Sequence, residues 1–132
     1  MLFTMKAVCE KTGMTYETLK FYCNQGLVPH VKRDAGNRRV FDERDVAWIE
    51  SLGCLKRCGL SIQEMRYYVQ LCLQGEASIP ERKKILAQKR QALVEQIAQL
   101  QGAVAYVDQK QAFYEDVLAG KRPYVSNLLP QE

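Results

Sequence analysis

The sequence predicts a mainly α-helical protein in which a small basic β-wing follows two short helices and one long helix comes last. Two helical segments, 4–12 and 16–22, are separated by a Gly-Met-Thr turn. Residues 30–41 combine a turn signal with four Lys or Arg, and residues 81–118 repeat apolar positions every seven residues. Helix, glycine turn, capped helix and basic hairpin form a winged helix-turn-helix, whose second helix fits a DNA major groove.

Composition is consistent with this fold but does not establish it. The chain has 132 residues, of which 47% are apolar and 26% charged, enough for one compact domain plus a long element. Residues 1–60 carry ten Lys or Arg against seven Asp or Glu, so they hold three of the four net positive charges. This mild bias alone does not indicate a nucleic-acid partner.

The sequence also predicts a cytoplasmic protein without a membrane partner. No apolar run approaches the roughly 20 residues needed to cross a bilayer, and the first residues lack a signal-peptide pattern. The five cysteines are odd in number and do not resemble a secreted disulfide framework. We therefore expect free thiols.

Local signals set the limits of the helices. Thr4 and Thr15 are candidate N-caps, and Gly13 can end the first helix in the left-handed conformation. Asp42 is expected to cap a third helix, and Ser61-Ile-Gln-Glu is a capping-box pattern that opens a fourth. Ser-Ile-Pro-Glu at 78–81 repeats that pattern. We assign residues 1–76 to the winged helix-turn-helix domain.

Residues 78–119 are predicted to form a dimerisation helix, and residues 120–132 a non-helical tail. Two sets of positions, each spaced by seven and offset by four, give an a/d heptad pattern with two polar interruptions. The first set is Leu86, Leu93, Leu100, Val107 and Tyr114; the second is Arg90, Ile97, Val104, Gln111 and Leu118. The preceding helices are too short to cover this stripe, so a second copy of the chain is the simplest partner. The alternative is a long helix folded back within one chain.

The ordered motifs resemble the MerR family of transcription regulators. Residues 15–29, T-Y-E-T-L-K-F-Y-C-N-Q-G-L-V-P, look like the family's helix-turn-helix signature. Residues 37–42 are similar to its wing segment, and residues 55–62 to its turn before the fourth helix. Departures occur at Lys20, Phe21, Asn37 and Arg38.

The resemblance implies a dimer joined by an antiparallel coiled coil that binds a palindromic promoter operator. It further implies that the dimer distorts this DNA so that RNA polymerase engages both promoter elements. Neither a cofactor nor a metal is implied. A drug-binding domain is not expected, because only about a dozen residues follow the long helix.

Two groups of residues are candidates for DNA contact. Groove or phosphate-wall candidates on the second helix are Thr15, Tyr16, Thr18, Lys20 and Tyr22. Candidates for the flanking DNA backbone are Lys6, Lys32, Arg33, Arg38, Arg39, Phe41, Lys56 and Arg57. The alternative for Tyr22 and Phe41 is a packing role, and for Lys6 and Lys56 a solvated surface.

Cys54 is the candidate sensor thiol. Residues 48–57, W-I-E-S-L-G-C-L-K-R, look like a segment of the aldehyde- and thiol-stress-responsive branch of the family, and Lys56 and Arg57 place positive charge near the sulfur. A plain core role is the alternative, because free cysteines are commonly buried. Cys58, four residues on, also leaves open soft-metal chelation or a disulfide.

No enzyme is predicted, because the sequence shows no nucleophile–base pair, phosphate loop or metal cluster. Residues 78–132 contain neither Cys nor His, which argues against metal sensing at the long helix. The competing function is a DNA-architecture protein or constitutive regulator of the same fold without a thiol sensor.

Overall fold

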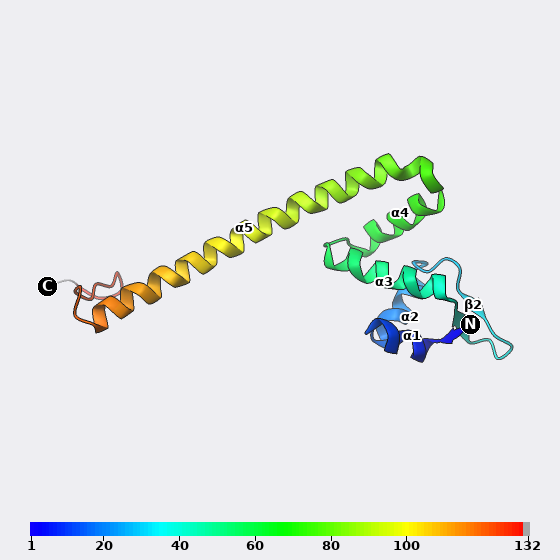
Figure 1. The fold of residues 1–132 in the computed structure, drawn as a ribbon, viewed down its shortest axis with the longest axis horizontal. Helices are drawn as coiled ribbons and strands as arrows, with labels where there is room; N and C mark the ends of the chain where they lie inside the picture. Colours follow the sequence, from blue (N-terminus) through cyan, green and yellow to red (C-terminus); the bar gives the residue numbers. More distant parts are fainter. Residues whose placement is uncertain (131–132) are drawn as a thin grey trace. The chain divides into compact units, whose positions relative to one another are not determined.

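The computed structural model describes residues 1–130 and confirms a mainly helical fold with a small wing sheet and a long final helix (Figure 1). In chain order the elements are β1 (Phe3–Thr4), α1 (Met5–Thr12), α2 (Tyr16–Asn24), β2 (Lys32–Arg33), β3 (Arg39–Phe41), α3 (Glu43–Arg57), α4 (Ile62–Leu73), the 3₁₀ helix η1 (Gly75–Ser78) and α5 (Ile79–Leu118). Two compact units are present, residues 1–90 and the residues from 91 onward. The predicted domain boundaries at residues 76 and 119 separate parts of the chain by their expected function and not by compactness, and they stay a prediction.

The helix-turn-helix forms as its capping residues predict. Thr4 Oγ1 accepts a hydrogen bond from the Ala7 N–H, and Thr15 Oγ1 accepts one from the Thr18 N–H, each at 3.2 Å. Gly13 ends α1 with φ at 73°, a conformation that costs glycine little. A three-residue turn therefore brings α1 and α2 together.

The wing is a three-stranded antiparallel sheet in the order β1-β3-β2. Asp34 Oδ1 accepts hydrogen bonds from the N–H groups of Gly36 and Arg38, both at 2.9 Å, and so closes the turn between β2 and β3. Asn37 takes φ at 61°, a region that Asn tolerates better than most residues. The pairing of β1 with β3 ties the start of the chain to the wing.

Capping boxes begin both α3 and α4. The Asp42 carboxylate accepts from the Asp45 N–H at 2.8 Å, and the Asp45 carboxylate accepts from the Asp42 N–H at 3.0 Å. Ser61 and Glu64 repeat this exchange at α4. The capping box predicted at residues 78–81 is wrong, because the Ser78 hydroxyl points back to donate to the Leu71 and Gly75 carbonyls. The 3₁₀ helix η1 runs directly into α5. Because the Ser78 hydroxyl is bonded to these two carbonyls, it does not cap α5.

One apolar core packs the four helices α1, α2, α3 and α4 together with the wing. Its most deeply buried members are Val8, Leu19, Leu27, Phe41, Ile49, Leu52, Leu60 and Met65. Burial of a side chain of this size contributes about 1.5–3 kcal/mol. A hydrogen bond of 2.7 Å from Trp48 Nε1 to the Leu27 carbonyl also attaches α3 to the loop after α2.

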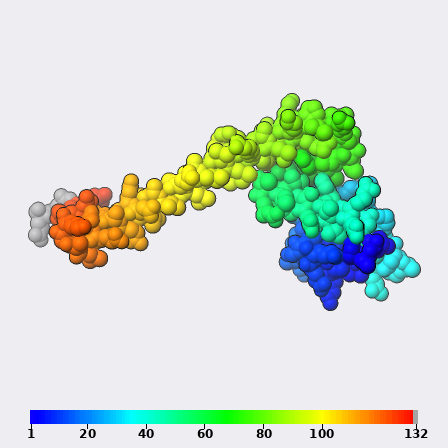
Figure 2. Space-filling model, in the orientation of Figure 1, coloured from blue at the N-terminus to red at the C-terminus, as the bar shows by residue number. Residues whose placement is uncertain are grey.

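The unit from residue 91 onward consists of the last part of α5 and a short tail (Figure 2). Tyr124 lies against Phe113 with ring centroids 6.5 Å apart, and the Arg122 guanidinium lies 5.5 Å from the Phe113 centroid. These contacts fold the tail back onto the end of its own helix. Within residues 1–130, no helix is long and apolar enough to cross a membrane.

We predict that the charge of Asp42 makes folding stability depend on acid pH. The Asp45 N–H, followed by Lys32 Nζ at 3.0 Å, lowers the pKa of the Asp42 carboxyl to about 2. Since this folded-state pKa lies below the unfolded value of about 3.9, the contribution is complete above pH ~4 and is lost as pH falls through about 2.

Asp42→Asn, which keeps a cap oxygen, tests this with urea unfolding across that range. Wild type should be the more stable protein at pH 6, and the difference should vanish near pH 2. A difference that is independent of pH would contradict the charge argument.

Candidate nucleic-acid interface

A basic groove lies where α1, α2 and the wing meet. Its volume is about 390 Å³. The lining residues are Thr4, Met5, Lys6, Tyr16, Arg33, Asp34, Arg38 and Arg39. Four cationic side chains therefore face one carboxylate, and that carboxylate is already bonded to the wing turn. This balance favours a polyanionic partner.

Two wing arginines are held in place by neighbouring groups. Arg39 Nη2 donates to Asn24 Oδ1 at 2.6 Å, which ties the wing to the end of α2. Arg33 Nη1 donates to the Asn37 carbonyl at 2.9 Å. Each guanidinium has five N–H donors, so each keeps donors for phosphate oxygens in an already ordered position.

Lys32 and Arg38 differ in how far their charge is already used. Lys32 forms an ion pair with Asp42, and its side chain remains 54% exposed. The Arg38 side chain makes neither a hydrogen bond nor an ion pair among residues 1–130. Arg38 is therefore the wing cation that has most freedom to adapt to a bound backbone.

The start of α2 presents the predicted recognition residues. Tyr16 is 53% exposed, and Lys20 is exposed further along the helix. The Thr15 hydroxyl accepts from the Thr18 N–H and donates to Thr18 Oγ1 at 2.8 Å, so it is used by the cap. Thr18 is partly buried, but its own hydroxyl proton is still available to an acceptor.

Tyr22 and Phe41 belong to the core, which favours the packing role that the sequence left open for both residues. Phe41 is completely buried, and Tyr22 is only 4% exposed. Tyr22 lies three residues after Leu19, on the face of α2 that packs inward, and burial raises the pKa of its phenol. Phe41 pairs with Phe3 across the sheet and faces the helices.

Lys56 and Arg57 are exposed at the end of α3 and do not line the basic groove. Arg57 instead donates through Nη2 to the Cys54 sulfur at 3.2 Å. A second depression, of about 300 Å³, surrounds this pair. Its lining residues are Lys11, Thr12, Met14, Ile49, Glu50, Gly53, Cys54 and Arg57.

Cys54 is the exposed thiol in a chain whose five cysteines are all unpaired. Cys9, Cys23, Cys58 and Cys72 are each partly buried, and burial raises the pKa of Cys9 and Cys23. Within residues 1–130, His, Cys, Asp and Glu form no group of three or more able to hold a metal ion. Access to solvent therefore distinguishes Cys54 from the other thiols.

A helix-turn-helix whose exposed second helix shares a basic groove with a wing defines a class of DNA-binding regulator. Residues 3–72 match the family described as MerR HTH family regulatory protein, and residues 46–110 match the one described as MerR, DNA binding. The chain belongs to the MerR family. It is a MerR-type DNA-binding transcriptional regulator and not an enzyme.

Named relatives and solved structures agree with this assignment. The chain is 41% identical to the HTH-type transcriptional regulator AdhR of Bacillus subtilis over 67% of its own length but only 63% of AdhR, less than two thirds. It is 32% identical to an HTH-type transcriptional regulator of Haemophilus influenzae, covering 90% of this chain and 88% of that one.

Among solved structures, HiNmlR is described as a MerR family regulator lacking the sensor domain, bound to promoter DNA. It superposes with a TM-score of 0.78 at 32% identity, over 90% of each chain. A MerR family regulator from Listeria monocytogenes gives the same TM-score at 30% identity, over 89% of each chain.

We predict that Arg39→Ala weakens DNA binding without changing sequence preference. Loss of one phosphate contact should lower affinity for specific and random DNA by a similar factor and reduce the salt slope by about 1. Fluorescence anisotropy over a salt series measures both effects. Arg66→Gln, an exposed change on α4, is the charge control. Unchanged affinity for both DNAs would remove Arg39 from the interface.

Proposed function

We propose that two copies of this chain bind a palindromic promoter operator and regulate transcription by distorting the DNA. The observation that carries this is the covalent connection of a winged helix-turn-helix to one unbroken helix of 40 residues. A helix of that length is about 60 Å long. Pairing along it would present two identical DNA-binding domains, which suits a twofold-symmetric site.

The exposed apolar face of α5 supports pairing with a second copy. Ile97, Leu100, Val104 and Val107 recur at heptad spacing and are between 54% and 66% exposed in the single chain. Contiguous apolar surface of this kind is uncommon on monomers and marks interfaces. The polar heptad positions Arg90 and Gln111 would select a register at some cost in stability. We propose the antiparallel arrangement typical of the family.

The wing and α2 would then act on the DNA through shape as well as contact. Phosphate contacts from the basic groove would fix the position of each domain, and the connection of the two domains through the paired helices would impose a spacing on the operator. An operator that does not fit this spacing must bend or twist, at an energy that depends on its sequence. Polymerase at the promoter would respond to the distorted DNA rather than to a large protein contact.

We predict that Leu100→Glu disrupts the dimer. A carboxylate at a seam position loses its water on pairing without gaining a partner, so association should weaken by at least about tenfold, equivalent to 1.4 kcal/mol. Sedimentation equilibrium measures the dissociation constant, and operator affinity should fall in parallel. Gln99→Glu, one residue earlier and outside the predicted seam, is the matched control. A dimer unaffected by Leu100→Glu would reject this helix face as the interface.

We further propose Cys54 as the thiol that senses electrophiles such as aldehydes. Its sulfur is exposed, the Arg57 guanidinium donates a hydrogen bond to it at 3.2 Å, and the depression around it gives a small molecule access. Addition of the thiol to an aldehyde breaks the S–H bond and forms the S–C bond, while the carbonyl π pair moves to oxygen, which takes up the proton that sulfur released. The product is a thiohemiacetal, and no oxidant is needed. A regulator of the same fold without a thiol sensor is the competing function.

Modification at this position would act on α3, which supplies much of the core. Cys54 lies between the buried Leu52 and Leu55 in the sequence, so new bulk at its sulfur is close to packed residues.

We predict that Cys54→Ser abolishes the aldehyde response but retains operator binding. The aldehyde response is measured as transcription from the bound promoter in a purified system, with and without formaldehyde. Cys58→Ser is the control. Equal responses of wild type and Cys54→Ser would favour the constitutive regulator.

A further inference from the structure

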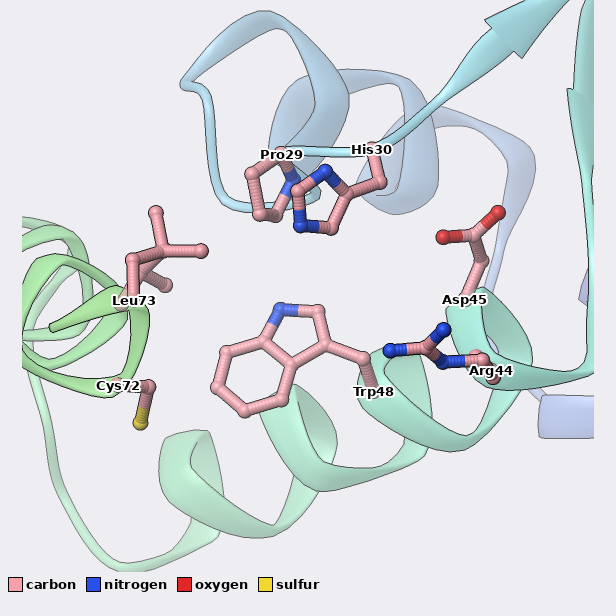
Figure 3. Close-up of a pocket in the computed structure, with 8 residues that line it drawn as sticks. Pro29, His30, Arg44, Asp45, Trp48, Cys72 and Leu73 are labelled. Atoms are coloured by element: carbon pink, nitrogen blue, oxygen red, sulfur yellow. The ribbon is translucent and has the colours of Figure 1, made fainter. Parts of the chain in front are cut away.

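An apolar pocket in the DNA-binding domain shares no lining residue with the basic groove or with the depression around Cys54. It lies between the loop after α2, the first turns of α3 and the end of α4, with a volume of about 200 Å³ (Figure 3). Its lining residues are Pro29, His30, Arg44, Asp45, Trp48, Val69, Cys72 and Leu73. We propose that this pocket binds a small aromatic carboxylate: one ring bearing one anionic group.

The size and the walls of the pocket suit a single ring. A protein cavity of about 150 Å³ with apolar walls holds benzene, so about 200 Å³ admits a ring with a small substituent. Trp48, Pro29 and Leu73 surround the apolar part of the space (Figure 3). Because Trp48 Nε1 is bonded to the Leu27 carbonyl at 2.7 Å, the indole is already ordered and need not be immobilised on binding.

The polar side chains at the rim favour an anion. The side chains of Arg44 and His30 border the pocket and make neither hydrogen bonds nor ion pairs among residues 1–130. Asp45, the one carboxylate in the lining, is 6% exposed and accepts the Asp42 N–H. Its negative charge therefore serves the start of α3, where the helix dipole also stabilises it. The planar Arg44 guanidinium remains available for a carboxylate.

The pocket also has a built-in reporter, because Trp48 is the only tryptophan in the chain. We would titrate the intact protein with benzoate at constant ionic strength and follow Trp48 fluorescence. Benzyl alcohol, which keeps the ring but lacks the charge, and acetate, which keeps the charge but lacks the ring, are the comparison probes. Benzoate should give a saturable change with Kd of about 1 mM or below, and the other two should bind at least about tenfold more weakly.

Two variants identify the site, each first checked for native helicity by circular dichroism. Arg44→Gln should weaken benzoate about tenfold and leave benzyl alcohol unchanged, whereas Arg66→Gln, the same charge change outside the pocket, should bind benzoate like wild type. Leu73→Glu, at an exposed lining position, should abolish benzoate binding by repulsion.

The proposal is overturned by the absence of a saturable change in wild type, by equal affinities for the three probes, or by equal losses in Arg44→Gln and Arg66→Gln. Cys54→Ser should bind benzoate normally, so this test is independent of the thiol chemistry.

Discussion

The reciprocal hydrogen bonds between Asp42 and Asp45 are the point at which the wing becomes part of the helical domain. Asp42 follows β3 directly, so the residue that ends the wing also caps α3. The same carboxylate accepts from Lys32 on the neighbouring strand. Both strands of the wing hairpin are therefore attached to the first turn of α3. Since the wing arginines line the basic groove, the position of that groove depends on this cap.

The rest of α3 extends this role through the domain. Ile49 and Leu52 are completely buried, and Trp48 reaches back to the loop that follows α2. Further along the helix, Cys54 and Arg57 are exposed together. One helix thus contributes to the support of the wing, to the apolar core, to the apolar pocket and to the candidate sensor thiol. Because interiors are close-packed, a change in the packing of α3 would alter the contacts of its buried neighbours as well.

Features controlled by local chemistry could be predicted from the sequence. The caps at Thr4, Thr15, Asp42 and Ser61 need only a side chain and a backbone N–H three residues away, and all four formed. The long helix was equally predictable from its seven-residue period. At Ser78 the local pattern failed, because two carbonyls of the preceding segment compete for the hydroxyl.

Features that depend on tertiary packing could not be predicted in the same way. Tyr22 and Phe41 occupy motif positions that are compatible with either DNA contact or burial, and only the packed domain shows that both are core residues. The support of Arg39 by Asn24 joins residues fifteen positions apart and has no signature in a single sequence. The same holds for the apolar pocket, whose lining comes from three separate segments.

The Glu64 carboxylate binds two partners at once, and one of these contacts depends on salt concentration. Its carboxylate completes the α4 cap and forms an ion pair of 2.8 Å with Lys89 of α5, and these partners lower its pKa. The pair is partly exposed, so dissolved ions screen it, just as they compete for DNA phosphates. A rise in salt concentration would therefore weaken both the binding of the protein to DNA and the attachment of α4 to α5.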